Sequence, residues 1–490
     1  MKKKSQFAKY IDYILKGSLL LFALSAPISI AATQIAWSIC LLCFIIRCFL
    51  GKQNLPKKKI DFVILAFVLL SLVSSIFSYE PQVSLKKMVA VLLVTIVYIF
   101  AENIRNSKTL HQIVAVLLIS AAFVAIYAAG DFALGKNVKV WQMTENSPLR
   151  MIGVKENDTI IRANGQKIHS PEEILKLVNE TGKVNLKIYR YELFFDYEIT
   201  KEPLLTGNNS AEQLGIVEWS RGRDIRAAGF YGHYTTYAEV LQLIASLALG
   251  LLIISTNGRI KILLTFALIL YTFALFLTVT RASWGSFVIS ASVIILFGAS
   301  KRTILICVAC AIPLILGGLF YLQQKRNVGF VDTKDGSTIW RLVVWREGFN
   351  LLVSNPRHLA VGVGMDSLIT HWQEWKLFDN GNLPMGHMHC TPLQFALERG
   401  LPTFLVWLIW MFIYLKMLWE SLRKNNLDWI ERGILLGAMG GTIGFLISSL
   451  VHYNWGDSEV VMIFYLIMGL SFAVIRGLKE NLEETQPVTA

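Results

Sequence analysis

Residues 260–299 read IKILLTFALILYTFALFLTVTRASWGSFVISASVIILFGA. The stretch contains two apolar runs, 260–280 and 282–299, and a single arginine, Arg281, stands between them. A helix needs about 20 mostly apolar residues to cross a bilayer, and both runs meet this length. Because an arginine is costly in the hydrocarbon core, Arg281 is expected at a membrane surface. The stretch therefore predicts two membrane-spanning helices joined by a very short turn.

The same pattern extends along most of the chain. Of the 490 residues, 54% are hydrophobic and only 17% are charged, whereas soluble proteins carry about 25% charged residues. This composition excludes a chain of soluble domains, and the high apolar content excludes a disordered chain. We predict an all-α polytopic membrane protein with about twelve transmembrane helices, at roughly 13–31, 33–50, 60–78, 86–102, 110–130, 236–256, 260–280, 282–299, 303–322, 393–416, 431–452 and 458–475.

Positive charges predict the orientation of these helices. The net charge is +13, and most lysines and arginines of the short loops follow even-numbered spans or lie near the two termini, as cytoplasmic segments do. Both termini are therefore expected in the cytoplasm, and the cations are expected to face anionic membrane lipid rather than nucleic acid. The basic start is interpreted as part of a retained first span. In a double-membrane bacterium the protein would lie in the inner membrane, with the long loops 131–235 and 323–392 in the periplasm.

The long loops also divide the chain into parts. Residues 1–130 are predicted to form five N-terminal spans, and 131–225 a periplasmic loop. Residues 226–475 are predicted to form a second membrane domain of seven spans, which includes the loop 323–392. The remaining residues, 476–490, are predicted to be a cytoplasmic tail.

A small α/β module is predicted within the first long loop, at about 145–200. The Asn-Gly pair at 164–165 is a turn signal between two strands, and Ser-Pro-Glu-Glu at 170–173 is typical of a helix start. Residues 184–190 alternate like a strand, and 194–199 are expected to pair with them. This order of elements resembles a bacterial PDZ domain. The resemblance implies that the module binds an extended peptide or protein partner along a sheet edge; the alternative is a rigid spacer.

The chemistry is predicted at the outer boundary of the second membrane domain. The sequence contains no P-loop, dinucleotide-binding, zinc-protease or serine-hydrolase motif, and we predict neither a metal ion nor a cofactor. Arginines, histidines and aromatic residues collect there instead. The candidate site residues are Arg226, Arg281, Arg341, Arg346, His387, His389 and Gly400.

These residue types suit a diphosphate carried on a lipid. Arginine is permanently charged and binds phosphate oxygens with two parallel hydrogen bonds, which would remove the need for a metal ion. A histidine can take a proton from an attacking hydroxyl near neutral pH. Simpler interpretations remain open: Arg281 as a surface cation, and Arg341 or Arg346 as a structural residue. His387 is an alternative to His389 as the base.

The order of these segments resembles the O-antigen ligase and polymerase superfamily. The resemblance rests on Arg281, the Trp340-Arg341 segment, Asn355-Pro356 with Gly362-Val363-Gly364, and His389 with Gly400. The ligase motif has a histidine, a small polar residue, nine further residues and a glycine. Here His389, Cys390 and Gly400 keep that spacing, and cysteine stands where the family has Asn, Ser or Gln. The resemblance covers roughly residues 225–450.

The resemblance implies a donor glycan on undecaprenyl diphosphate and a metal-independent transfer that inverts the anomeric centre. Arg281 and Arg341 would bind the diphosphate, His389 would activate or orient the acceptor hydroxyl, and Arg226, Arg346, His387 and Gly400 would support the site. The acceptor would be lipid A core in a ligase, another lipid-linked glycan in a polymerase, or a protein side chain in an oligosaccharyltransferase, in that order of preference. A transporter or a non-catalytic membrane scaffold is the alternative from a different class.

Overall fold

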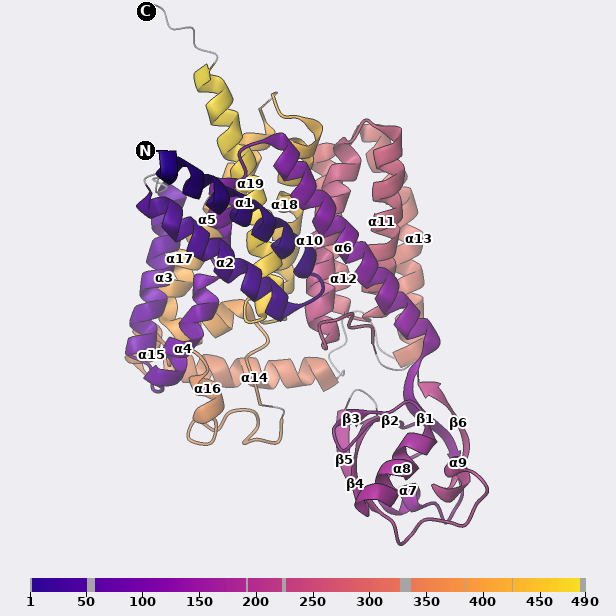
Figure 1. Ribbon diagram of the computed structural model, residues 1–490. Helices are drawn as coiled ribbons and strands as arrows, with labels where there is room; N and C mark the ends of the chain where they lie inside the picture. The colour runs from indigo at the N-terminus through magenta and orange to yellow at the C-terminus, as the bar shows by residue number, and fades with distance from the viewer. Residues whose placement is uncertain are drawn as a thin grey trace, which may run out of the picture. The chain divides into compact units, whose positions relative to one another are not determined.

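The computed structural model describes residues 2–50, 58–190, 193–222, 226–326, 336–383, 385–424 and 426–484. The chain divides into two compact units. Met1–Ala125 and Ala228–Ala490 form one unit, called here the membrane body, and Ile126–Ala227 form the other, called the sheet unit. Figure 1 shows that the membrane body is helical and that the sheet unit contains the strands, so the predicted fold class is confirmed.

Every predicted span is helical in the structure, and the fourth span is divided into two short helices. These helices are α1 (Lys2–Ser25), α2 (Ile30–Phe49), α3 (Lys59–Ile76), α4 (Pro81–Leu92), α5 (Thr95–Asn103), α6 (Ser107–Leu134), α10 (Tyr234–Ile254), α11 (Gly258–Leu277), α12 (Arg281–Gly298), α13 (Lys301–Arg326), α17 (Thr391–Leu422), α18 (Trp429–Ser448) and α19 (Ser458–Glu484). Helix α6 begins in the membrane body and ends in the sheet unit.

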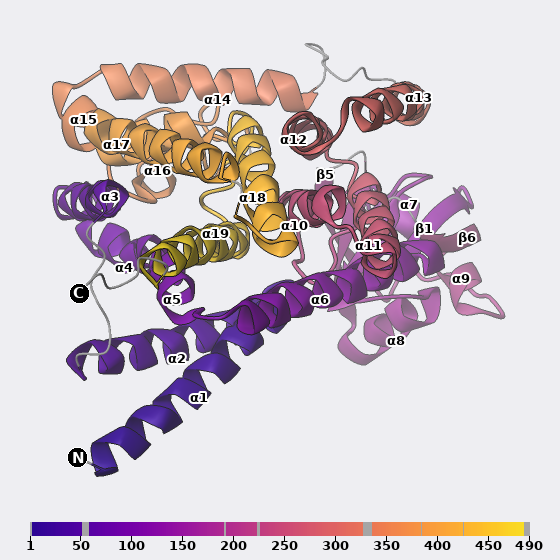
Figure 2. The same cartoon turned by 90° about the horizontal axis from the view of Figure 1, so that it is seen from above.

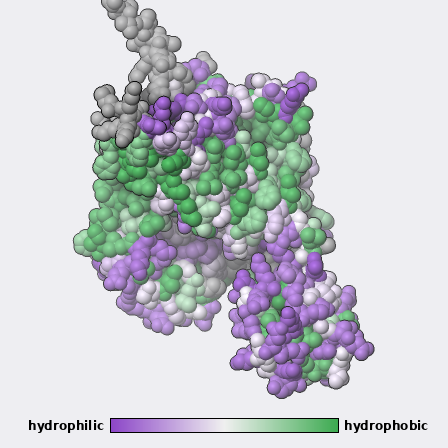
Figure 3. Space-filling view, viewed as in Figure 1, coloured by the Kyte–Doolittle hydropathy of each residue, from purple (hydrophilic) through white to green (hydrophobic). Residues whose placement is uncertain are grey.

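The number of helices suited to a bilayer is slightly lower than the predicted twelve. Among the described residues, ten helices are long and apolar enough to cross a membrane, with α4 and α5 taken together. Helices α1 and α13 are not among these ten; α1 carries Lys9, Asp12 and Lys16 in its length. On the face shown in Figure 3, hydrophobic residues form a band around the membrane body between two hydrophilic ends.

Three helices form the interior of the membrane body. Most residues of the α10, α18 and α19 spans are buried, and Figure 2 shows these helices toward the centre of the bundle. Glycines let α10 approach α18 closely, because a Cβ atom on Gly250 would lie only 2.5 Å from Gly433 O and Gly437 N. Without a hydrophobic driving force between helices in lipid, such close backbone packing is what holds spanning helices together.

Three helices in the predicted outer loop, 323–392, do not cross the membrane. These are α14 (Gly336–Val353), α15 (Pro356–Val361) and α16 (Ser367–Thr370). Helix α14 runs across one end of the bundle, and both the start of α1 and the end of α19 lie at the opposite end (Figure 1). The long helix α14 therefore carries the predicted Trp340-Arg341 segment on a rigid element at the end of the bundle away from the termini.

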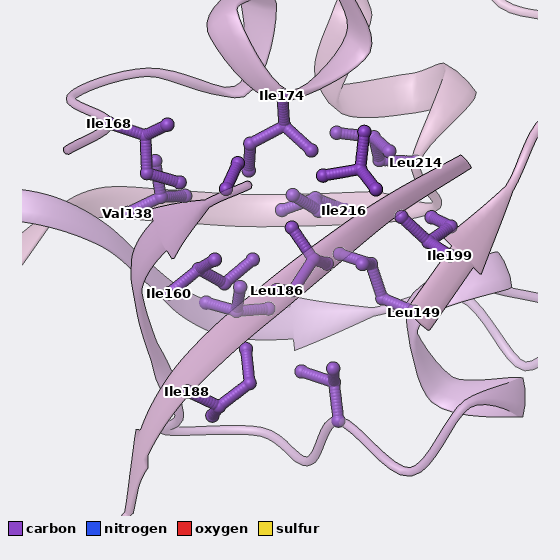
Figure 4. Packing of buried hydrophobic residues seen from close by; sticks show 14 of the residues in the cluster. Val138, Leu149, Ile160, Ile168, Ile174, Leu186, Ile188, Ile199, Leu214 and Ile216 are labelled. Carbon is purple, nitrogen blue, oxygen red and sulfur yellow. The ribbon is translucent and has the colours of Figure 1, made fainter. Parts of the chain in front are cut away.

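In its described residues, the sheet unit contains one antiparallel sheet, three helices of its own and the end of α6. The strands are β1 (Lys136–Met143), β2 (Thr159–Ala163), β3 (Gln166–Lys167), β4 (Lys183–Arg190), β5 (Leu193–Thr200) and β6 (Ile216–Gly222), in the order β5-β4-β2-β1-β6 with β3 beside β2. The helices are α7 (Pro148–Met151), α8 (Pro171–Thr181) and α9 (Ser210–Gln213). Alternate strand residues and the helices α7 and α8 supply an aliphatic core, shown in Figure 4, that includes Val138, Leu149, Ile160, Ile174, Leu186 and Ile216.

The local predictions for this unit are confirmed. The Asn164-Gly165 turn joins β2 to β3, and β4 pairs with β5 along its whole length. Helix α8 begins at Pro171 and ends at Gly182, whose φ of +75° suits a glycine. The sheet also extends beyond 145–200 on both sides through β1 and β6, which pair with each other. The resemblance to a PDZ domain stays a prediction.

Candidate functional site

The predicted histidines lie on a short segment that precedes α17. Two hydrogen bonds hold this segment in place: Met388 N donates to Gln394 Oε1 at 2.7 Å, and Trp345 Nε1 donates to Met388 O at 2.8 Å. One partner lies on α17 and the other on α14. The segment from His387 to His389 is therefore held between these two helices, and the orientation of its side chains is restricted.

His389 is enclosed by rings. Its imidazole centroid lies 4.2 Å from the Trp340 ring and 4.0 Å from the His387 ring. Burial lowers the pKa of His389 to about 2, and His387, Arg341 and His452 lower it further by their charge. Burial likewise lowers the pKa of His387 to about 4. Both imidazoles are therefore neutral at neutral pH.

Arg341 and Arg346 lie on different faces of α14. Arg341 is half-buried, and its Nε donates to Val451 O at 3.2 Å. Arg346 is exposed. Residues five apart on a helix do not share a face. The structure thus directs Arg341 toward the bundle, where it influences His389, and leaves Arg346 at the surface.

Arg281 is the first residue of α12 and is half-buried. The turn before it contains Val279 at a φ of +50°, a conformation that a β-branched residue rarely adopts. His389 also has a positive φ, of +47°. Backbone strain of this kind costs about 1–3 kcal/mol and clusters at functional sites. The two strained residues lie at or beside the two candidate residues Arg281 and His389.

A polar network that the sequence analysis missed connects these segments. Glu239 on α10 is fully buried, and its carboxylate accepts hydrogen bonds from Ser283 Oγ (3.1 Å), Ser448 Oγ, His452 Nδ1 (3.1 Å) and Asn454 Nδ2 (3.4 Å). Ser283 is two residues from Arg281. A carboxylate inside an apolar run is rare and usually functional, so Glu239 in the run 236–256 carried a signal that could have identified it.

The loop between α18 and α19 also contacts the histidine segment directly. Thr391 donates to His452 O from its backbone N at 3.2 Å and from its Oγ1 at 3.1 Å. Thr391 Oγ1 also donates to Asn454 Oδ1 at 3.0 Å. These bonds place His452 beside the segment that carries His389. No motif marks His452 in the sequence.

Gly400 has a structural part in this arrangement. It interrupts α17 with φ +81° and ψ 162°, and a Cβ atom there would lie 2.5 Å from Ala360 O. The backbone of α17 then receives the loop after α15: Val363 N donates to Leu397 O at 2.9 Å and Gly364 N to Glu398 O at 2.8 Å. Backbone hydrogen bonds thus join the Gly362-Val363-Gly364 motif to the helix that contains Gly400. They fix α15 against α17.

The structure brings some of the predicted site residues together and separates others. His387, His389 and Arg341 lie close to one another, and Ser283, two residues after Arg281, donates to Glu239 in the neighbouring network. Arg346 is exposed on α14, and Gly400 lies on α17 against α15. Arg226 belongs to the sheet unit rather than to the membrane body.

Comparison with known families covers the centre of this site. Residues 265–408 match the family model described as O-Antigen ligase. The matched segment contains Arg281, Arg341, His387, His389 and Gly400 and ends before His452. No curated protein matches the chain. The resemblance inferred from the sequence motifs is therefore confirmed over residues 265–408, where this polytopic membrane protein is similar to the O-antigen ligase family.

Proposed function

We propose that the protein is a glycosyltransferase of the bacterial inner membrane. It moves a glycan from undecaprenyl diphosphate to an acceptor hydroxyl, most favourably the lipid A core, as an O-antigen ligase does. The observation that carries the proposal is the packing of His389 against Trp340 and His387, with Arg341 close enough to act on His389 by its charge, inside the segment that matches the O-antigen ligase family. The family match supports glycan transfer in a membrane, and the cluster supplies residues suited to its chemistry.

Arg281 and Arg341 are assigned to the diphosphate. The acceptor oxygen attacks the anomeric carbon, the bond from that carbon to the diphosphate oxygen breaks, and the electron pair leaves with the diphosphate. Guanidinium groups stabilise the charge that develops there, and a fixed cation needs no reorganisation as the bond breaks. A single direct displacement inverts the anomeric configuration. His389 activates or orients the acceptor hydroxyl, with His387 beside it.

The proposed site faces the periplasm. The start of α1 and the end of α19 lie at one end of the bundle, and α14 crosses the other (Figure 1). If both termini are cytoplasmic, as the charges of the loops predict, α14 and the histidine segment lie on the outer side. A lipid-linked diphosphate would then meet the site at headgroup level, below the apolar band.

The same transfer reaction is compatible with two other acceptors. A second lipid-linked glycan would make the protein a polymerase, and a protein hydroxyl would make it an oligosaccharyltransferase. The sheet unit bears on this choice, because β5 and β6 are the edge strands of its described sheet. Edge strands can accept an extended peptide, and Val217 on β6 is exposed. We propose peptide binding there as a secondary role, which would favour a protein acceptor or partner.

A transporter or scaffold is the competing class. Its helices would also be apolar, but its coupling residues are expected near the middle of the membrane, whereas the cluster here lies at one end of the bundle. Replacing His389 separates the classes, since a transporter is expected to keep working.

The proposal is tested in cells that lack the gene. We expect the lipid-linked glycan donor to accumulate and the corresponding surface glycan to disappear. The wild-type gene should restore both, and a His389→Ala gene expressed at the same level should restore neither. Unchanged donor and surface glycans in the deletion strain would overturn the proposal. The product that disappears identifies the acceptor.

A further inference from the structure

We propose that His452, held by Glu239, is the catalytic residue that accepts the proton of the acceptor hydroxyl, and that His389 orients that hydroxyl. The inference rests on the proposed function and deepens it, because it assigns the proton to a residue outside the segment that matches the ligase family. Its basis is the geometry of the buried Glu239–His452 pair.

The carboxylate determines which nitrogen of His452 carries the proton. His452 Nδ1 lies 3.1 Å from Glu239 Oε1, and a carboxylate accepts hydrogen bonds but does not donate them. The proton of the neutral imidazole is therefore on Nδ1, which leaves the lone pair on Nε2. A carboxylate that holds a histidine in this tautomer and stabilises its imidazolium is the arrangement that makes a histidine an effective base.

Glu239 is rigid in this position. Its side chain is only 1% exposed, and hydroxyl, amide and imidazole groups from three further segments donate to it. Burying a carboxylate is costly unless it is hydrogen-bonded, and a positively charged His452 would offset that cost further. Glu239 is therefore positioned to stabilise the imidazolium that forms when His452 accepts a proton.

The pair also lies among the residues assigned to the donor and the acceptor. The neighbour of His452, Val451, accepts a hydrogen bond from Arg341 Nε. Thr391, two residues after His389, donates to the carbonyl of His452. Ser283, two residues after Arg281, donates to Glu239. Three separate contacts therefore connect His452 and Glu239 to the proposed site.

His389 has different surroundings. Its ring packs against Trp340 and His387, and its pKa falls to about 2 through burial and neighbouring positive charge. A base that weak gains little by taking a proton at neutral pH. A half-buried ring that packs against two others suits a group that orients the acceptor hydroxyl.

The proposed step transfers the glycan to the acceptor and the proton to His452. The acceptor oxygen forms its bond to the anomeric carbon, and its proton passes to Nε2 of His452. The bond between the anomeric carbon and the diphosphate breaks, and the electron pair remains on the diphosphate beside the arginines. Glu239 is a positioning residue that stabilises the resulting imidazolium.

The test uses the purified full chain and a membrane extract from cells lacking the gene, which supplies accumulated donor and native acceptor. We measure release of undecaprenyl diphosphate and, separately, binding of added undecaprenyl diphosphate. His452→Gln should lower the rate of release by about 10²- to 10⁴-fold and leave binding within about twofold, since an uncharged base makes little contact with the diphosphate. His111→Gln, at a histidine near the start of α6, is the matched control and should keep both.

Glu239→Gln provides the second variant, with a readout that a purely structural role would not change. The Glu239 carboxylate stabilises the imidazolium by its charge, so its removal should lower the maximal rate and move the acidic limb of the pH–rate profile to lower pH. Other groups that influence this limb are His387 and His389 before α17, His233 before α10, Arg341 on α14 and Asp457 before α19, whose pKa burial raises to about 6. Glu239→Asp should restore part of the rate.

Failure of the proposed function and failure of this inference give different results. A wild-type protein that releases no undecaprenyl diphosphate would sink the proposed function, and this inference with it. An active wild type together with a His452→Gln variant that binds and releases undecaprenyl diphosphate within about threefold of it would overturn the inference alone. Lost release with retained binding, together with the shifted acidic limb, supports it.

Discussion

The sheet unit and the membrane body both bury charged residues, but they do so differently. In the sheet unit, Arg190 Nε and Nη2 donate to the two oxygens of Asp158 at 2.7 and 2.6 Å, which makes a closed pair. The rest of that core is aliphatic (Figure 4). In the membrane body, Glu239 instead collects neutral donors and a histidine around one end of the bundle.

Backbone strain follows the same division. Val279 and His389 have positive φ angles at the end of the membrane body where the candidate residues meet. The non-glycine residues with positive φ in the described part of the sheet unit are asparagines, at 137, 157 and 164, which tolerate this conformation. The membrane body also has positive φ at Asp366, Lys376, Phe378, Asp379 and Asn380, between α15 and α17. Strain of this kind is costly, and the membrane body therefore carries more of it than the sheet unit does.

Replacing His389 is expected to have the largest effect on glycan transfer. His389→Ala should lower glycan transfer by about 10²- to 10⁴-fold, because a positioned acid–base or orienting group is lost. Protein level and membrane insertion should remain unchanged. His111→Ala, near the start of α6, serves as the control. Full transfer by His389→Ala would move the proposed role to His387, and full transfer with both replaced would remove these histidines from the mechanism.

Replacing Arg341 or Arg281 should have the next largest effect on glycan transfer. Arg341→Lys and Arg281→Lys keep the charge but lose the planar pair of donors, so transfer should fall by about 10²-fold. Arg346→Lys, on the exposed face of the same helix, should change transfer by less than about threefold, since exposed contacts contribute little. Steady-state rates with extracted donor measure all three. Equal losses for Arg341→Lys and Arg346→Lys would contradict the separation of the two faces.

Gly400 should affect stability more than chemistry. Gly400→Ala places a methyl group against Ala360 O at a φ of +81°, so the membrane body should lose about 1–3 kcal/mol and melt at a lower temperature. Gly258→Ala, where a Cβ atom meets nothing within 4 Å, should melt like the wild type. Thermal unfolding in detergent measures the difference, and equal melting temperatures would show that the kink tolerates a side chain.

The smallest effect on transfer is expected from the sheet unit. Ile160→Ala removes a fully buried side chain and should destabilise that unit by about 2–5 kcal/mol, which limited proteolysis detects. Transfer by the membrane body should stay near the wild-type rate. A loss of transfer comparable to that of His389→Ala would show that the two units do not act separately.

The sequence predicted the elements that local pattern determines. Apolar runs located the spans, because a helix in lipid must satisfy its own backbone hydrogen bonds. The Asn164-Gly165 turn and the β4–β5 pair were also predicted, because the residues that form them lie close together in the chain. The pairing of β1 with β6 was missed, since its partners are about 80 residues apart in the chain. Helix α14 was missed because its apolar residues are interrupted by Arg341, Arg346 and Glu347.

Motifs marked several candidate residues in the sequence, and their roles stay predictions. Arg341, His387 and His389 lie close together in the structure. The network around Glu239 and His452 depends on the meeting of α10, α12 and the loop before α19, and no spacing in the sequence determines that meeting. The role of Arg226 stays a prediction, because Arg226 lies in the sheet unit and the other candidates lie in the membrane body.

The most direct measurement is glycan transfer by the purified full chain, followed as the release of undecaprenyl diphosphate from donor extracted from cells lacking the gene. We expect the wild-type protein to transfer the glycan at the same rate with and without EDTA, since arginines hold the leaving diphosphate. Arg341→Lys and His389→Ala should bring the release close to background. Transfer that EDTA abolishes and Mg²⁺ restores, or full activity of both variants, would contradict the account.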